Sequence, residues 1–404
     1  MDDCPHGCHG ARMSPALPPL APAILATATP PIPAARAWAR SYTGTAGPLI
    51  DLTQAVPGYP PHPALLERLA TAAGDSACAA YGDIEGDGAL REALAADISA
   101  CYRASVAATD LAITAGGNLA FAMAATVLAG PGEAVMLPAP WYFNHHMALT
   151  MRGVATVPLP CRAEDGFVPD PDRAAALLDP RVRAIVLVTP NNPTGAIYPP
   201  AVIARFAELC RARGLWLVID ETYRDFLPDP AGVPHGLFAD PSWRDVFVHL
   251  YSFSKAYCVP GHRLGAIAAG PRLREQLVKV LDTLQICPPR AGQTAIAWAI
   301  EALRPWREAN RRLMAGRADA FREAAGRLRH WRLDALGGYF AYLRLPEGAP
   351  DALAMARHLA GERGLLTLPG PFFGPGQERH LRVAFANADL PRIAEVPNRL
   401  IQAG

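Results

Sequence analysis

Apolar residues along the chain fall into two kinds of run. Short runs that are apolar throughout predict buried strands at Ala134–Leu137, Ala184–Val188, Leu215–Ile219, Val246–Tyr251 and Leu264–Ala269. Runs with apolar residues every three or four positions predict helices at Pro63–Ala73, Ala89–Cys101, Leu119–Ala129, Pro200–Arg213 and Arg272–Leu284. Strands without polar alternation are typical of a sheet that is covered on both faces. The pattern therefore predicts an α/β fold with a mostly parallel sheet.

The pattern changes toward both ends of the chain. Residues 14–48 are rich in proline and alanine, which predicts an arm rather than a packed element. From about residue 291 the chain is mostly helical, with two more candidate strands at Tyr339–Leu343 and Leu381–Phe385. We expect a partly disordered arm at 1–50, a large domain at 51–290 and a smaller α+β domain at 291–404. Residues 51–60 are candidates for packing against the smaller domain.

Charge and cysteine usage exclude several classes of protein. The 38 basic and 37 acidic residues give a formal net charge of +1, so no nucleic-acid footprint or polybasic membrane patch is present. No apolar run is long enough to span a bilayer, and prolines interrupt residues 17–35, which argues against a signal peptide. The 8 cysteines are scattered without a CxxC pair, which favours reduced thiols and a cytoplasmic protein.

The first residues place Cys4, His6, Cys8 and His9 close together. Their spacing, CxxxCH, differs from the usual CxxCH, and no second cluster of ligands follows nearby. We therefore assign no metal.

Lysine occurs only twice, at Lys255 and Lys279. Lys255 follows Ser252 and Ser254 and precedes Arg263, a set that suits an aldehyde cofactor carrying a phosphate. The amine forms a Schiff base, while the hydroxyl and the guanidinium neutralise the phosphate. A surface lysine in a loop is the alternative for Lys255, and Lys279 lies on a solvated helix face.

Three polar residues stand at the ends of predicted strands. Asn192, Asp220 and Lys255 follow or end three of the apolar runs, and ligands of parallel sheets bind beyond such carboxyl ends. A buried Asp220 requires a cation, for which a protonated pyridine nitrogen is suitable, and Tyr223 reaches the same ring. An ordinary turn at Asn192 and a helix cap at Asp220 are the alternatives.

Two more features indicate anion binding. Gly117 and Asn118 open an apolar helix, whose N-terminal N–H groups can bind a phosphate. Arg382 lies inside an apolar strand and needs an anionic partner, for which a substrate carboxylate is a candidate. A common glycine pair and a packing salt bridge are the respective alternatives.

In order and spacing, these segments resemble the fold-type I PLP enzymes, specifically the aspartate aminotransferase-like class I/II aminotransferases, over roughly residues 50–390. The matching segments are Tyr81…Gly86…Leu90-Arg91, Ala115-Gly116-Gly117, Asn191-Asn192-Pro193-Thr194-Gly195, Asp220-x-x-Tyr223, Ser252-x-Ser254-Lys255…Arg263-x-Gly265 and Leu381-Arg382. The resemblance implies the fold-type I architecture, with a large domain around a mostly parallel sheet and a smaller α+β domain. It also implies pyridoxal 5′-phosphate (PLP) as cofactor and an amino acid and a 2-oxo acid as substrates.

The resemblance assigns roles residue by residue. Lys255 forms the Schiff base and moves a proton, Asp220 pairs with the pyridine N–H, and Asn192 and Tyr223 contact the ring hydroxyl. The phosphate would be held by Ser252, Ser254, Arg263 and the backbone of Gly117 and Asn118. Tyr142 would stack on the ring, with Trp141 as the other candidate, and His145 would support Asp220. Arg382 would bind the substrate carboxylate near Asn192, Ala55 and Tyr142. Tyr81 would reach the neighbouring subunit's cofactor, which implies a homodimer with shared sites.

Two departures from the family bear on the substrate. Asp282 falls near the position where dicarboxylate-specific members carry an arginine, and Ala55 replaces a usual glycine. With Tyr59, Tyr142, Phe372 and Phe373 as expected pocket residues, we expect a neutral, apolar or aromatic substrate, with Arg290 as a substitute partner for glutamate. A C–S β-lyase or a decarboxylase on the same fold is the alternative. An amino-acid sensor is the remote one, because residues 1–50 are too short and proline-rich for a helix-turn-helix.

Overall fold

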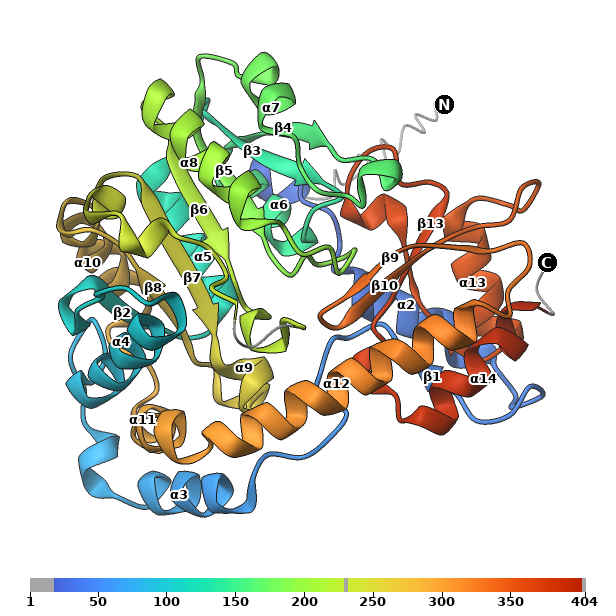
Figure 1. The fold of residues 1–404 in the computed structure, drawn as a ribbon, viewed down its shortest axis with the longest axis horizontal. Helices are drawn as coiled ribbons and strands as arrows, with labels where there is room; N and C mark the ends of the chain where they lie inside the picture. Colours follow the sequence, from blue (N-terminus) through green and yellow to red (C-terminus); the bar gives the residue numbers. More distant parts are fainter. Residues whose placement is uncertain (1–17, 229–231, 402–404) are drawn as a thin grey trace, which may run out of the picture.

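A seven-stranded sheet forms the centre of the larger lobe (Figure 1). The computed structural model describes residues 18–228 and 232–401, so Cys4, His6 and Cys8 lie outside the described part. In spatial order the strands are β2 (Leu111–Thr114), β8 (Gly265–Ala268), β7 (Phe247–Ser252), β6 (Trp216–Asp220), β5 (Val182–Val188), β3 (Ala134–Ala139) and β4 (Ala155–Pro160). Only β8 runs against its neighbours, and the four other pairings are parallel. The predicted mostly parallel sheet is confirmed.

Helices cover both faces of this sheet (Figure 1). Along β5, Ile185 and Leu187 pack into one apolar cluster with α4, α8 and α11, whereas Ala184 and Val186 pack into another with α5 and α10. The helices of this lobe are α3 (Pro63–Ala73), α4 (Gly88–Tyr102), α5 (Gly117–Leu128), α6 (Phe143–Thr150), α7 (Pro171–Leu177), α8 (Pro200–Arg213), α9 (Phe253–Ala256), α10 (Pro271–Gln285) and α11 (Arg290–Ala302). Because both faces are buried, the side chains on either face of the central strands are mostly apolar, as the continuous runs predicted.

The C-terminal lobe is built on an antiparallel sheet. Its spatial order is β12 (Leu368–Pro369), β13 (His380–Val383), β10 (Phe340–Arg344) and β9 (Arg332–Gly337). Its helices are α12 (Arg304–Ala325), α13 (Ala352–Glu362) and α14 (Leu390–Ile401). A separate parallel pair joins β1 (Ile50–Asp51) to β11 (Leu365–Leu366), so the start of the predicted large domain pairs with the C-terminal lobe.

The division into domains remains a proposal, and the packing favours a boundary later than residue 290. Helix α11 contacts α3 and α4, whereas α12 contacts α14 and β9. The long α12 crosses from one lobe to the other (Figure 1). We therefore propose that α11 belongs to the large lobe and that α12 connects the two.

The N-terminal segment is more ordered than its composition indicated. We expected an arm without packed elements, and this is wrong for α2 (Pro31–Trp38), which follows the short α1 (Pro22–Leu25). Helix α2 contacts α13 and β12, and Ala35 is fully buried. Pro31 begins the helix, at a position whose missing N–H costs no hydrogen bond. The prolines that we took as signs of an arm are thus compatible with this helix.

Two strands of the large sheet were not predicted. β2 has only four residues, and β4 contains two prolines and is mostly half-exposed. β2 and β4 are the two edge strands, where proline is tolerated because one side of the strand makes no sheet hydrogen bonds. Within residues 18–228 and 232–401, no helix is long and apolar enough to cross a membrane.

Candidate active site

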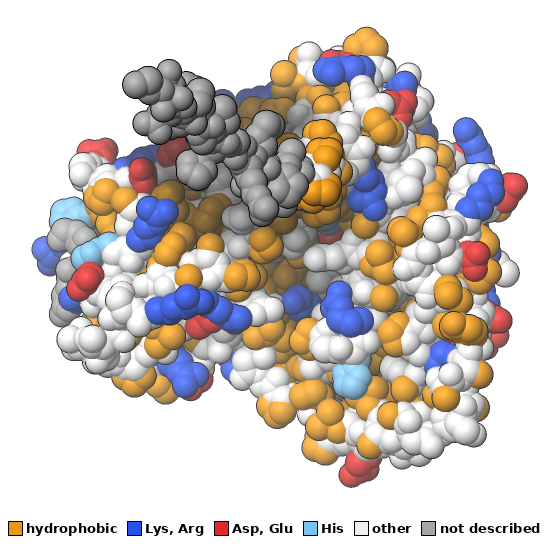
Figure 2. Space-filling model, turned by 180° about the vertical axis from the view of Figure 1, so that it is seen from behind, with side chains coloured by type: hydrophobic (Ala, Val, Ile, Leu, Met, Phe, Trp, Pro, Cys, Tyr) orange, Lys and Arg blue, Asp and Glu red, His pale blue; other side chains and the backbone are white. Residues whose placement is uncertain are grey.

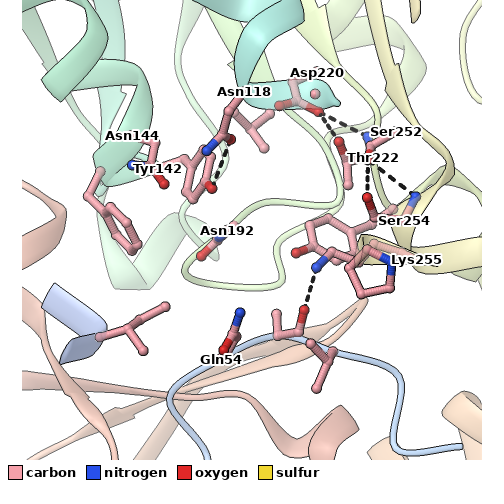
Figure 3. A pocket seen from close by; sticks show the side chains of 18 of the residues that line it. Gln54, Asn118, Tyr142, Asn144, Asn192, Asp220, Thr222, Ser252, Ser254 and Lys255 are labelled. Atoms are coloured by element: carbon pink, nitrogen blue, oxygen red, sulfur yellow. Dashed lines mark hydrogen bonds between the residues drawn. The ribbon is translucent and has the colours of Figure 1, made fainter. Parts of the chain in front are cut away.

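A cavity of about 330 Å³ opens where the carboxyl ends of β5, β6 and β7 face the C-terminal lobe (Figure 3). From behind, the molecule is hollowed between its lobes, and charged side chains of both signs are scattered singly over that face (Figure 2). Lining residues that the sequence had singled out are Ala55, Gly117, Asn118, Tyr142, Asn192, Asp220, Tyr223, Ser252, Ser254, Lys255, Arg263 and Arg382. The cavity thus brings together twelve residues that are spread over more than 320 positions of the chain.

Asp220, the last residue of β6, is a buried carboxylate with two hydrogen bonds from Thr222 and a close contact with His145. Thr222 donates through its backbone nitrogen (3.0 Å) and its hydroxyl (2.7 Å) to Oδ1. His145 Nε2 lies 3.2 Å from Oδ2, and the His145 ring stacks on Phe121 at 3.9 Å between centroids. Burial acts to raise the pKa of Asp220, but the contacts with His145 and Thr222 outweigh it and hold that pKa below its usual value. Asp220 is therefore an anion that can face a cation in the cavity.

Lys255 extends from the short helix α9, directly after β7. Its Nζ donates to the backbone carbonyl of Ala55, which comes from the N-terminal segment. Burial, together with the positive charges of Arg382 and Arg263, lowers the pKa of Lys255 to about 8. A substantial fraction of the amine is therefore neutral near pH 8, as a nucleophilic lysine requires.

An anion cradle lies beside Lys255. Helix α5 begins at Gly117, and Gly116 before it has φ +96°, where a Cβ would collide with the Arg263 guanidinium. The hydroxyl of Ser252 donates to that of Ser254 over 3.0 Å, at the start of α9. Backbone N–H groups, hydroxyls and a guanidinium in one place are the donors that a phosphate needs.

Arg382 enters the same cavity from β13 of the other lobe. Its Nη1 donates to Asn192 Oδ1 over 3.1 Å, and Nη2 donates to the carbonyl of Thr53. The guanidinium lies 5.1 Å from the ring centroid of Phe340 and 5.2 Å from that of Phe373. Burial lowers the pKa of Arg382 to about 10, which still leaves it charged at neutral pH. No carboxylate pairs with it among the described residues, so it can accept an anionic ligand.

The two aromatic candidates for ring stacking are separated by the structure. Tyr142 lines the cavity and donates its hydroxyl to Asn118 Oδ1 over 3.1 Å (Figure 3). Trp141 turns away, stacks on His146 at 4.9 Å and lies against Gly374. The geometry therefore favours Tyr142, and its spacing to His145 agrees with the position of His145 behind Asp220.

Several expected residues lie outside the cavity. The prediction that Tyr59, Phe372 and Phe373 line it is wrong: Tyr59 packs on Trp306, Phe372 on Trp38, and Phe373 behind Arg382. Asp282 lies on the exposed face of α10. Tyr81 is 78% exposed and borders a separate surface groove with Arg290.

Sequence reasoning also missed lining residues. Thr222 is the one that the sequence could have indicated, because a threonine two positions after a buried aspartate often donates a hydrogen bond back to it. Ile32, Gln54 and Asn144 come from segments with no periodic pattern, and nothing in the sequence marked them.

Comparison with known proteins identifies the chain. Residues 48–400 match the model of the family described as aminotransferase class I and II. The chain belongs to this family. It is 30% identical over 343 residues to an aromatic aminotransferase of Arabidopsis thaliana, covering 83% of this chain and 84% of that protein. It is 33% identical over 311 residues to an arginine–pyruvate transaminase of Pseudomonas aeruginosa, covering 75% and 77%. A mutant aspartate aminotransferase of Thermus thermophilus has the same fold, with a TM-score of 0.87 at 24% identity over 96% of this chain and 100% of that one.

The protein is thus a PLP-dependent aminotransferase, and its cavity suits the cofactor. The cradle at Gly117 and Arg263 provides donors for a phosphate, and the buried Asp220 carboxylate provides the partner for a ring N–H. Lys255, between them, provides the amine. No group of three or more His, Cys, Asp or Glu side chains suited to a metal occurs within the described ranges.

The lowered pKa of Lys255 predicts a pH-dependent effect on apoprotein stability. The unfolded lysine, with its ordinary value of 10.5, binds a proton more tightly than the folded one, with about 8. The positive charge of Lys255 therefore lowers the free energy of unfolding below pH 8. This loss of stability disappears as pH rises from 8 through 10.5. We expect Lys255→Met to stabilise the apoprotein by about 1–3 kcal/mol at pH 7, from 1.36 kcal/mol per pKa unit, and much less above pH 10.

Urea unfolding of the apoprotein at the two pH values measures this effect. Lys279→Met is the matched control, because Lys279 is exposed on α10 and its amine donates to the side chain of Gln276 (2.7 Å). An equal stabilisation by Lys255→Met at both pH values would contradict the assignment.

Proposed function

We propose that this aminotransferase moves the amino group of a neutral, apolar or aromatic L-amino acid to a 2-oxo acid, with ping-pong kinetics. The observation that carries the proposal is the convergence of Lys255, Asp220 and Arg382 in one cavity, next to the anion cradle at Arg263. The names of the relatives, an aromatic aminotransferase and an arginine–pyruvate transaminase, support amino transfer to a 2-oxo acid, and the first of them agrees with an aromatic donor.

In this proposal, the cofactor's phosphate is held by the start of α5 (Gly117 and Asn118), by Ser252 and Ser254, and by Arg263. Asp220 holds the proton on the ring nitrogen, and its charge is maintained by His145 and Thr222. Asn192 and Tyr223, which both line the cavity, would contact the ring hydroxyl. When bound, PLP supplies an electron sink that weakens the bond between the substrate Cα and its hydrogen.

The substrate is oriented by Arg382. Its planar guanidinium suits a carboxylate bidentately, and its present acceptors, Asn192 Oδ1 and the Thr53 carbonyl, are neutral. A carboxylate therefore replaces a weaker acceptor with a charge-assisted one. Lys255 Nζ takes the proton from the substrate Cα, and it can leave the Ala55 carbonyl that now accepts from it.

The rest of the lining favours an uncharged side chain. Ile32 and Phe143 provide apolar surface, and Gln54 and Asn144 provide neutral amides. Among the described lining residues, the charged ones are Lys255, Arg263, Arg382 and Asp220, all with roles already assigned. A distal carboxylate of the substrate would find no guanidinium there, and an unpaired buried charge costs several kcal/mol.

We further propose a homodimer in the cytoplasm. Tyr81 is 78% exposed and lies on a glycine-containing loop outside its own chain's cavity. An aromatic side chain presented in this way suits contact with a second copy, where it would reach the cofactor's phosphate. The location in the cytoplasm rests on the scattered cysteines and stays a prediction.

The central test of the chemistry is borohydride reduction of the protein loaded with PLP. We expect the reduced cofactor on a peptide that contains Lys255 and not on one that contains Lys279. We also expect Lys255→Ala to lose turnover almost completely, since both the amine that bonds PLP and the proton carrier are removed. Label on Lys279, or unchanged turnover of Lys255→Ala, would refute the assignment.

The substrate class is tested by kcat/KM across amino donors with one shared oxo acid. We expect leucine, methionine and phenylalanine to exceed aspartate by at least about tenfold, from the cost of an unpaired carboxylate. Arg382→Ala should lower kcat/KM for all donors alike, because each of them carries the α-carboxylate. Aspartate as the best donor would overturn the proposed side-chain pocket.

The shared site is tested with hybrid dimers. Subunits carrying Lys255→Ala are mixed with subunits carrying Tyr81→Phe, which gives hybrids with one site that has lost both residues and one site with neither change. If Tyr81 acts across the interface, the hybrid regains about one wild-type site per dimer. Activity no higher than the mean of the two parents, or a fully active monomer on sedimentation, would contradict the proposal.

A further inference from the structure

The ring of Tyr142 packs against an apolar cluster and borders the cavity. Tyr142 precedes α6, and its ring contacts Phe143 and His145, each at 5.1 Å between centroids. The other side of the ring faces the cavity, and the residue is half-exposed there. Toward the cavity, the ring therefore has open space beside it.

The hydroxyl of Tyr142 supplies a further restraint. It donates to Asn118 Oδ1 over 3.1 Å, which joins the second residue of α5 to the residue before α6 (Figure 3). Burial and the charge of Asp220 raise the pKa of Tyr142 to about 12, so the hydroxyl keeps its proton at neutral pH and acts as the donor. In the open cavity water competes for this bond, whereas a ligand that fills the cavity excludes that water and strengthens it.

The same ring also touches the support of Asp220. His145 meets the Tyr142 ring edge-to-face at an interplanar angle of 77° and lies 3.2 Å from Asp220 Oδ2. A turn of the Tyr142 ring would thus remove one wall of the cavity and one neighbour of His145 together. The hydrogen bond to Asn118 adds to the packing that holds both in place.

We propose that the Asn118 side chain is a positioning residue, which fixes the ring of Tyr142 through its hydroxyl and so prepares the cavity for the flat ring of the cofactor. This role is separate from the contact of the Asn118 backbone with the phosphate. It rests on the proposed placement of PLP against Tyr142. A ring that is already fixed loses less entropy when the cofactor binds, so the bond increases cofactor affinity.

A double-mutant cycle tests the pairing with Asn118→Ala, Tyr142→Phe and the double variant. Tyr142→Phe keeps the stacking surface and removes only the hydroxyl. We expect each single variant to raise the dissociation constant of PLP by about 2- to 10-fold, the range for one hydrogen bond. The double variant should be no worse than either single one, because both changes remove the same bond. The absorption and circular-dichroism bands of the bound cofactor should shift equally in all three.

An exposed asparagine far along the chain provides the control, and two outcomes would contradict the pairing of Asn118 with Tyr142. Asn398→Ala removes an exposed amide that bonds Glu395 over 2.8 Å on α14, and it should leave the PLP dissociation constant unchanged. Asn118→Asp keeps an acceptor oxygen and should restore the cofactor bands of the wild type, even where its added charge weakens phosphate binding. Losses that multiply in the double variant would overturn the pairing, as would wild-type bands in Asn118→Ala. If the unmodified protein bound no PLP, the proposed function itself would fail instead.

Discussion

The balance of charge inside the cavity is the constraint on which the rest of the site depends. Lys255, Arg263 and Arg382 bring three cations to one cavity, against the single carboxylate of Asp220. Burial lowers the pKa of both Lys255 and Arg382, and the charges of Arg382 and Arg263 lower that of Lys255 further, so the protein without ligands holds its cations at an electrostatic cost. A phosphate and a substrate carboxylate relieve that cost. The fold therefore makes the site selective for molecules that bring negative charge to two separate points.

When no anionic ligand is bound, neutral backbone carbonyls accept hydrogen bonds from Arg382 and Lys255, the two most buried of these cations. Thr53 accepts from Arg382 and Ala55 from Lys255, so one short segment bonds to residues of both lobes. That segment follows β1, which pairs with β11 of the C-terminal lobe. Because a carbonyl is a weaker acceptor than a carboxylate, the arrangement restrains both side chains without preventing an anionic ligand from displacing these bonds. The positions of Arg382 and Lys255 in the cavity thus depend on a segment that is itself held by the C-terminal lobe.

Sequence reasoning succeeded where neighbours in the chain determine the geometry. Continuous apolar runs predicted β5, β6 and β7, and parallel neighbours necessarily bring Asn192, Asp220 and Lys255 to one edge of the sheet. It failed where distant segments pack together. The bond between Arg382 and Asn192 joins residues 190 positions apart, and the place of Phe373 behind Arg382 depends on how the lobes meet. Helix α2 was missed because prolines in a first helical turn resemble those of an extended arm.

Residues for the cofactor and residues for the substrate side chain come from different parts of the fold. The groups for cofactor chemistry stand at the ends of strands in a sheet packed on both faces, where a substitution disturbs two apolar clusters. The lining residues proposed to face the substrate side chain, Ile32, Gln54 and Asn144, come from the N-terminal segment and from α6, outside that sheet. These positions can change without loss of the sheet's packing. Relatives at about 30% identity can therefore keep one reaction while their names refer to substrates as different as aromatic amino acids and arginine.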